Sequence, residues 1–110
     1  MKYLYIRSVL TYIYILFGFK KYEIRKSSKF VNTLKEGDII QITYQKYNFP
    51  CKIISIINYP SLYDVFHSNI HFKEIIPNSI SINDAMNRYK NYYHDYEISS
   101  FKSFKLSTIV

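Results

Sequence analysis

Two isoleucine-rich segments in the middle of the chain place the strongest constraint on its fold. We predict strands over residues 39–45 and 51–57, and each carries isoleucine on positions that would face both sides of a sheet. Neither face of such a strand can be left in water, so the rest of the chain must cover both. The segment Tyr47-Asn48-Phe49-Pro50 predicts the turn of a hairpin between them. The sequence therefore favours a closed or covered sheet.

Further elements are predicted on both sides of this hairpin. We expect a first strand over residues 2–6 and a closing strand over residues 101–109. The predicted helical segments are a first helix capped by Ser8 and ended at Gly18, short segments over 61–66 and 72–76, and a last helix from Ser81. By spacing, the residues expected to face the core are Val9, Leu10, Ile13, Leu16 and Phe17 in the first helix and Ile82, Ala85, Met86, Tyr89 and Tyr93 in the last.

The net charge of +7 is concentrated in the first third of the chain. The charged residues up to position 36 are Lys2, Arg7, Lys20, Lys21, Arg25, Lys26, Lys29 and Lys35, against only Glu23 and Glu36. A basic segment interleaved with tyrosines is typical of a nucleic-acid-binding protein, because phosphates attract it whatever their sequence. The same charge also suits an anionic membrane surface, or simply keeps a protein soluble.

The apolar run near the N-terminus does not predict a membrane span. The uncharged run from Ser8 to Phe19 is shorter than the roughly 20 residues that a helix needs to cross a bilayer. No cleavage site of small residues follows it, so we expect neither a signal peptide nor stable membrane insertion.

The cysteine and histidine content argues against disulfides and metal. Cys51 is the only cysteine, which suits a reducing compartment, so we expect an intracellular protein, cytoplasmic or nuclear. Its apolar surroundings favour a core position over a nucleophile. His67 and His71 lie four residues apart but lack a third good ligand, so we expect no metal site. We expect no cofactor either, since the chain has no glycine-rich phosphate loop.

The candidate site is the segment Gly18–Arg25, which has the pattern G-x-K-x-x-E-x-R. In an extended strand Lys21, Glu23 and Arg25 share one face, and Lys20 can turn inward because it follows closely on a glycine. Two cations and a carboxylate can bind a flat polar group such as a phosphate, a base edge or an acyl group. Alternatively, these charges form ordinary ion pairs that only hold the fold together.

The order of these landmarks resembles the ASCH domain, a small barrel of the PUA-like superfamily. The resemblance covers nearly the whole chain as one domain, residues 1–110. Its matching residues are Gly18, Lys20, Glu23 and Arg25, the turn Gly37-Asp38 before a strand, Tyr59-Pro60-Ser61-Leu62 before a short helix, Pro77, the last helix with Tyr92-Tyr93, and the final strand. The implied fold is α+β: a barrel of about five or six strands with two to three short flanking helices.

The resemblance implies a cleft lined by Lys20, Glu23 and Arg25 that binds RNA or a modified nucleotide. One branch of the family hydrolyses the acetyl amide of N4-acetylcytidine with a lysine, a threonine and a glutamate. Its lysine corresponds to Lys20, but Glu23 stands at the threonine position and Asn78 at the acid position, with Glu74 close by.

Two functional hypotheses follow beside the purely structural alternative. As a binding module, the chain would hold RNA or a nucleotide with Lys20, Lys21, Glu23, Arg25 and Lys26, and single-stranded RNA is favoured because its bases are exposed. As an amidohydrolase, it would use candidate catalytic residues Lys20, Glu23 and Glu74. The pattern leaves the oligomeric state open.

Overall fold

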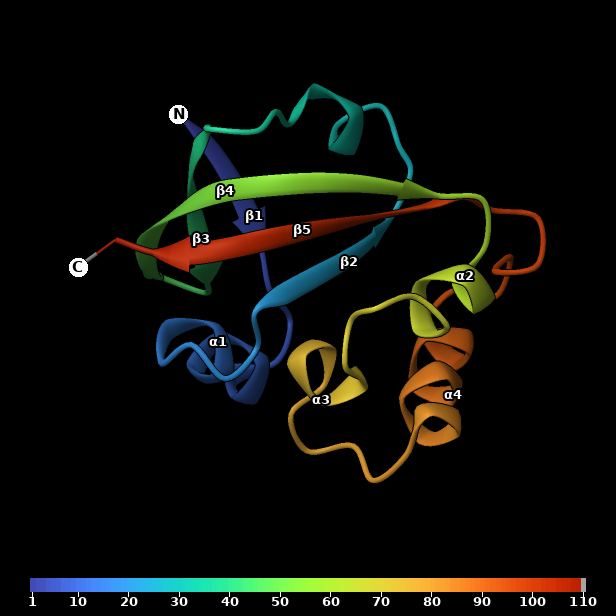
Figure 1. Cartoon of the computed structure of the whole chain (residues 1–110). Helices are drawn as coiled ribbons and strands as arrows, with labels where there is room; N and C mark the ends of the chain where they lie inside the picture. The colour runs from blue at the N-terminus through green and yellow to red at the C-terminus, as the bar shows by residue number, and fades with distance from the viewer. Residues whose placement is uncertain (110) are drawn as a thin grey trace.

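The computed structural model describes residues 1–109, which form five strands and four α-helices (Figure 1). The strands are β1 (Lys2–Tyr5), β2 (Tyr22–Lys26), β3 (Ile39–Tyr44), β4 (Tyr47–Tyr59) and β5 (Phe101–Thr108). The helices are α1 (Val9–Leu16), α2 (Leu62–Phe66), α3 (Phe72–Ile75) and α4 (Ile82–Tyr92), with a 3-10 turn at Val31–Thr33.

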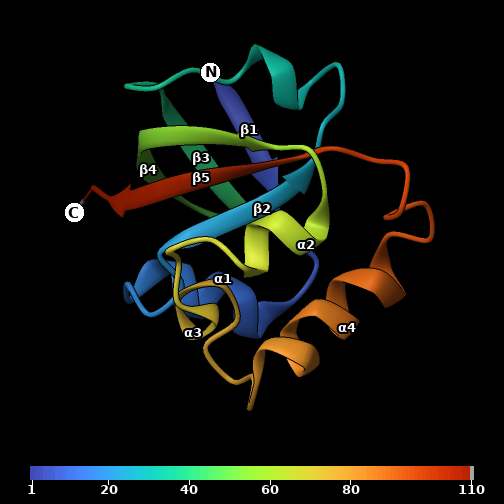
Figure 2. The same cartoon turned by 45° about the vertical axis from the view of Figure 1, so that its right-hand side comes forward.

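The five strands form one mixed sheet that curls into a half-barrel (Figures 1 and 2). The strand order is β1-β3-β4-β5-β2; β1 and β3 run parallel, and the other neighbours run antiparallel. The expected α+β fold with a small barrel-like sheet is confirmed. The resemblance implied two to three flanking helices, whereas the structure has four, at the four segments for which the sequence predicts helix.

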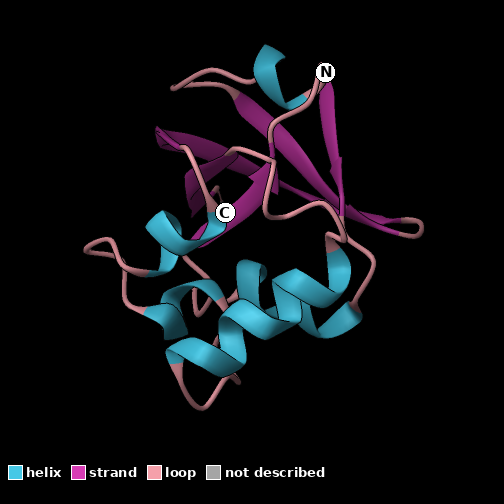
Figure 3. Cartoon of the chain, turned by 90° about the vertical axis from the view of Figure 1, so that its right-hand side faces the viewer, coloured by secondary structure: helices cyan, strands magenta, loops and turns pink. Residues whose placement is uncertain are grey.

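Two apolar clusters form the core, but the expectation that both faces of residues 39–45 and 51–57 are covered is wrong. The buried apolar side chains of β3 and β4 all belong to the first cluster, whereas Ile39, Ile54 and Ile57 are 50%, 45% and 46% exposed. The first cluster joins β1, β3 and β4 to α1, and it includes Leu4, Ile15, Ile40, Ile42, Phe49, Cys51, Ile53 and Phe104. The second joins β2 and β5 to α2, α3 and α4, and it comprises Ile24, Leu62, Val65, Phe66, Ile75, Ala85, Met86 and Phe101. Figure 3 shows the four α-helices gathered below the strands, with the 3-10 turn on the opposite side. Cys51 is completely buried, as predicted for a core cysteine.

The predicted turn at residues 47–50 is wrong. The structure runs β4 from Tyr47, so the hairpin turns two residues earlier, at Gln45 and Lys46. Gln45 has a φ of 52°, a left-handed conformation that residues other than glycine seldom adopt. No glycine marked this turn, whereas Pro50, a residue common in turns, lies within the strand opposite Gln41.

The orientation predicted for the first helix is also wrong in part. Ile15 is the fully buried side chain of α1, and Tyr12 and Leu16 pack beside it. Four of the five residues expected in the core are exposed instead: Val9, Leu10, Ile13 and Phe17. The helix sequence VLTYIYIL is apolar or aromatic on every side, so it lacks the polar stripe that would orient it.

No helix within residues 1–109 is long and apolar enough to cross a membrane. The same residues contain no group of three or more metal-ligating side chains. His67 instead stacks on the ring of Tyr63, and His71 caps the short helix α3.

Candidate functional site

The turn after α1 determines where Lys20 points. Gly18 has a φ of 80°, which reverses the chain at the end of the helix. The amides of Phe19 and Lys20 then both donate to the carbonyl oxygen of Tyr14, at 2.9 and 3.0 Å. The chain enters β2 with the Lys20 side chain directed inward, where it is only 4% exposed.

The buried ammonium of Lys20 is surrounded by oxygen atoms. Nζ donates to the carbonyl oxygen of Ile75 at 2.5 Å and lies 3.4 Å from Oε1 of Glu23. A weaker contact of 3.5 Å joins it to the hydroxyl of Tyr89. A lysine ammonium has three protons, so these three neighbours satisfy all its donors. Lys20 therefore forms part of the floor of the site.

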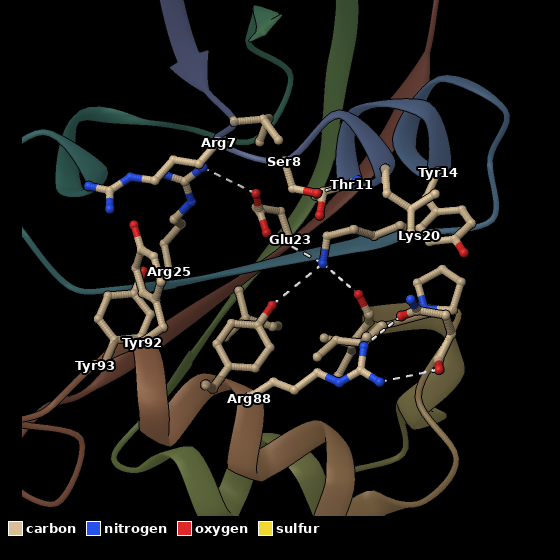
Figure 4. A pocket seen from close by; sticks show the side chains of 18 of the residues that line it. Arg7, Ser8, Thr11, Tyr14, Lys20, Glu23, Arg25, Arg88, Tyr92 and Tyr93 are labelled. Carbon is tan, nitrogen blue, oxygen red and sulfur yellow. Dashed lines mark hydrogen bonds and ion pairs between the residues drawn. The ribbon is translucent and has the colours of Figure 1, made fainter.

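Glu23 lies between two cations (Figure 4). Its second carboxylate oxygen, Oε2, accepts from Nη2 of Arg25 at 3.2 Å. The same guanidinium nitrogen donates to the backbone carbonyl oxygen of Tyr5 at 2.9 Å. We call Lys20, Glu23 and Arg25 the triad. Because Tyr5 belongs to β1 and Arg25 to β2, the triad lies where the two edge strands approach each other.

Burial and charge act in opposite directions on the triad. Burial lowers the pKa of Lys20, although the neighbouring Glu23 opposes this effect. Burial also acts to raise the pKa of Glu23, but Lys20 and Arg25 outweigh it and hold that pKa below its ordinary value. Burial likewise acts against the charge of Arg25, yet Glu23 outweighs it and raises the pKa of the guanidinium. The site therefore keeps an ionised carboxylate below the surface.

Arg25 is the member of the triad that still has donors to offer. Its side chain is 26% exposed, against 7% for Glu23 and 4% for Lys20. Among residues 1–109, Nη2 makes the hydrogen bonds of this guanidinium, which leaves Nε and Nη1 without a partner. Both edges of a guanidinium that can form two parallel hydrogen bonds include Nη2, so the free Nε and Nη1 of Arg25 can each donate a single charge-assisted hydrogen bond to a phosphate or a base.

The triad opens into a cavity of about 400 Å³. This volume lies within the range of small-molecule binding sites. The walls come from the β1–α1 connection, α1, the start of β2, the segment 75–78 and α4. The lining residues are Tyr5, Ile6, Arg7, Ser8, Leu10, Thr11, Tyr14, Lys20, Glu23, Ile24, Arg25, Ile75, Ile76, Pro77, Asn78, Arg88, Tyr89, Tyr92 and Tyr93.

Two further arginines line this cavity, and they differ in how firmly they are held. Arg88 donates to Oδ1 of Asn78 at 2.7 Å and to Asp84 at 3.1 Å, so its guanidinium is engaged. Arg7 is exposed, and its guanidinium carbon lies 5.1 Å from the centroid of the Tyr92 ring. Within residues 1–109, Arg7 makes no hydrogen bond or ion pair through its side chain, so its donors face solvent.

Tyrosines supply much of the remaining wall. Tyr89 and Tyr93 pack against the second apolar cluster, as their helical spacing predicted, but they also line the cavity. Burial raises the pKa of Tyr89 well above its ordinary value, so the hydroxyl keeps its proton. Tyr92 and Tyr5 are half exposed or more at the rim, where their rings offer flat surfaces.

Three of the predicted site residues converge, and three do not. Lys20, Glu23 and Arg25 meet in the triad, whereas Lys21, Lys26 and Glu74 lie outside the cavity.

The placement of Lys21 on the face of Glu23 and Arg25 is wrong, because β2 begins only at Tyr22. The Lys21 side chain is 55% exposed and lies 3.6 Å from Glu74. Lys26 follows the alternation of the strand to the other side and pairs with Asp95 at 2.8 Å.

The sequence analysis did not identify Arg7 and Arg88 as site residues, because both lie outside the pattern G-x-K-x-x-E-x-R. Arg88 and Tyr92 are four residues apart on α4, as are Tyr89 and Tyr93, so helical spacing could have indicated a second wall. No comparable signal pointed to Arg7, which lies beyond the end of β1 in the connection to α1. Asn78, which the sequence resemblance aligned with a catalytic acid, lines the cavity and accepts a hydrogen bond from Arg88 through its side-chain oxygen.

Comparison with known proteins supports the fold and carries no information on function. No family model matches the sequence, and no curated protein matches it significantly. The structure is similar to the crystal structure of the hypothetical protein PH0355, with a TM-score of 0.81 and 19% identity over 99% of this chain and 100% of that one. It is also similar to the solution structure of protein PF0455 from Pyrococcus furiosus, with a TM-score of 0.74 and 14% identity over 98% and 96% of the two chains. The fold therefore occurs in other proteins as a unit of this length.

Proposed function

We propose that the cavity binds a nucleotide, either free or as part of an RNA chain, and that the protein is an intracellular nucleotide-binding domain of the ASCH type. One observation carries the proposal: the charged side chains lining the cavity are four cations and a single carboxylate. These are Arg7, Lys20, Arg25 and Arg88 against Glu23. Such a balance favours an anionic ligand, and the tyrosine rings beside it suit a flat base.

The roles of the residues follow from the hydrogen-bond donors and acceptors that each has unused. Arg25 presents free donors to a phosphate or a base edge, and Arg7 adds a second, uncommitted guanidinium at the rim. Lys20 is already saturated by protein oxygens, so it contributes charge to the floor without a direct contact. Glu23 orients the two cations and can also accept from an exocyclic amine through its remaining lone pairs.

Calorimetric titration with the four nucleoside monophosphates and their nucleosides tests the proposal. We expect a monophosphate to bind, and Arg7→Ala to weaken that binding on the order of tenfold, because a charge-assisted contact is lost. Lys21→Ala is the matched control: it removes the same charge from a side chain outside the cavity and should leave the affinity nearly unchanged. Equal weakening by both variants, or no binding by any of these compounds, would contradict the proposal.

A second candidate function is hydrolysis of an amide on a modified base such as N4-acetylcytidine. It is favoured by the buried Lys20, since burial lowers its pKa and so favours the neutral amine that a base or nucleophile needs. Two features of the structure count against hydrolysis. Glu23 is ion-paired with both Lys20 and Arg25, and Glu74 lies outside the cavity. Release of cytidine from N4-acetylcytidine by the protein, and its loss in a folded Lys20→Ala variant, would favour this function over simple binding.

A further inference from the structure

The outward face of β1 carries an unusual set of side chains. Leu4 and Ile6 point into the core, and the alternate residues Tyr3 and Tyr5 point outward with 42% and 66% of their surface exposed. The two rings are nearly parallel, with an angle of 24° between them and 6.3 Å between their centroids. Exposed rings of this kind serve single-stranded nucleic acids as stacking platforms.

This face is continuous with the rim of the cavity. Tyr5 and Arg7 both line the cavity, and Arg7 lies against the ring of Tyr92 on α4. We call the four side chains Tyr3, Tyr5, Arg7 and Tyr92 the β1 track. No acidic residue occurs in the sequence before Glu23, so the segment that forms most of the track carries no charge that would repel phosphates.

We propose that the β1 track binds a single-stranded polynucleotide, with one nucleotide of that strand in the cavity. This inference rests on the proposed function, since the cavity supplies the end point of the path. Bases adjoining the bound nucleotide stack on Tyr5 and Tyr3, and Arg7 contacts the phosphate that leaves the cavity. A duplex does not fit this mode, because its bases are stacked on one another and cannot reach the rings.

The track predicts how affinity depends on the length of the strand. One nucleotide occupies the cavity, and the neighbouring nucleotides meet Arg7, Tyr5 and Tyr3 in turn. Affinity should therefore rise with each added nucleotide and level off on the order of four, since each stacked base at such sites strengthens binding roughly fivefold or more.

The test measures fluorescence anisotropy of labelled oligouridylates and oligothymidylates of two to ten nucleotides, with the four unlabelled nucleoside monophosphates, UMP among them, and a matched RNA duplex as competitors. Tyr3→Ala is the decisive variant, because Tyr3 belongs to the track but does not line the cavity. We expect it to weaken a six-nucleotide strand roughly fivefold or more, the loss of one stacked base. Tyr63→Ala is the control, because Tyr63 is more exposed than Tyr3, 59% against 42%, but lies on α2, outside the cavity.

The outcomes separate this inference from the proposed function. Suppose that UMP binds in the cavity. If the affinity for a strand is then independent of its length, or if Tyr3→Ala and Tyr63→Ala have the same effect, the track is wrong and the proposed function of the cavity is retained. If Tyr3→Ala weakens a longer strand but none of the four nucleoside monophosphates competes with it, the strand binds along the track alone, and both the proposed cavity function and the placement of one nucleotide in the cavity fail. Equal binding of the duplex overturns the track. A preference for uridylates over thymidylates supports an RNA ligand, and equal affinity supports single strands of either kind.

Discussion

The Arg25 guanidinium donates a 2.9 Å hydrogen bond to the backbone carbonyl oxygen of Tyr5, and so joins the two edge strands of the sheet. In the strand order β1-β3-β4-β5-β2, these two residues belong to opposite ends. The same nitrogen also binds Glu23 at 3.2 Å. One side chain thus helps to hold the half-barrel together and also faces the cavity, which ties the stability of the fold to the geometry of the site.

Arg25→Lys should destabilise the protein although the charge is kept. The lysine side chain is one bond shorter, so its ammonium does not reach the position of Nη2, which donates to both Glu23 and Tyr5; we expect a loss of about 1–3 kcal/mol in the free energy of unfolding. Urea denaturation measures this loss, and amide hydrogen exchange should show faster exchange in β1. Lys26→Met, which breaks only the exposed pair with Asp95, should cost at most about 1 kcal/mol. If the two variants are equally stable, Arg25 does not link the edges.

Glu23→Gln should be among the most damaging single changes. It leaves the ammonium of Lys20 buried without its carboxylate, a situation that costs about 3–5 kcal/mol. The double variant Lys20→Met/Glu23→Gln removes the buried charge as well, so it should recover part of that loss. Chemical denaturation of the wild type, both single variants and the double variant gives the coupling energy. Additive effects of the two changes would show that the pair is not coupled.

Acid should destabilise the protein through Glu23. The pKa of Glu23 is lower in the folded protein than its ordinary value of about 4.5. Its stabilising contribution is therefore complete above about pH 4.5 and is lost as the pH falls through the lower, folded pKa. Thermal unfolding followed from pH 7 to pH 2 should show this loss in the wild type. The Glu23→Gln variant should lack that part of the acid dependence, and an identical pH profile in both proteins would contradict the assignment.

Gly18→Ala should cost about 1–2 kcal/mol of stability, because the residue has a φ of 80° and an added Cβ meets nothing within 4 Å. The cost is therefore backbone strain alone. Gly37→Ala is a matched control with a φ of 87° and equally open space. Both variants should lose similar stability in a denaturation experiment. Only the change at Gly18 should also weaken nucleotide binding, because that turn directs Lys20 inward; equal affinity in both variants would contradict this role.

Much of the fold could be predicted from the sequence, because its signals are local. The caps at Ser8, Ser61 and Ser81 begin helices where predicted, and each side chain accepts from a backbone amide of the first turn. Gly18 ends the first helix as expected. The position of the hairpin turn and the buried face of α1 were predicted wrongly, because the local sequence marks neither. The turn uses a glutamine in the left-handed conformation, and α1 has apolar or aromatic residues on every side.

The candidate site could be predicted only in part. The pattern G-x-K-x-x-E-x-R predicted Lys20, Glu23 and Arg25 as site residues, because the three lie close together in one segment. Arg7 and Arg88 come from different parts of the chain and meet these three residues only through packing of α4 and the β1–α1 connection. Alternation along an assumed strand wrongly added Lys21, because that rule applies only where the strand has begun.

The most direct test of the proposed nucleotide site is a two-dimensional NMR titration of the isotope-labelled wild-type protein with the four nucleoside monophosphates. The proposal predicts that a monophosphate shifts amide signals in the segments that line the cavity, residues 5–11, 20–25, 75–78 and 88–93. A second hollow, lined by residues that include Tyr22, Tyr59 and Lys105, serves as the internal comparison. Its signals should stay unchanged apart from that of Tyr22, which adjoins Glu23 in β2. Shifts confined to that second hollow, or none with any monophosphate, would contradict the proposal.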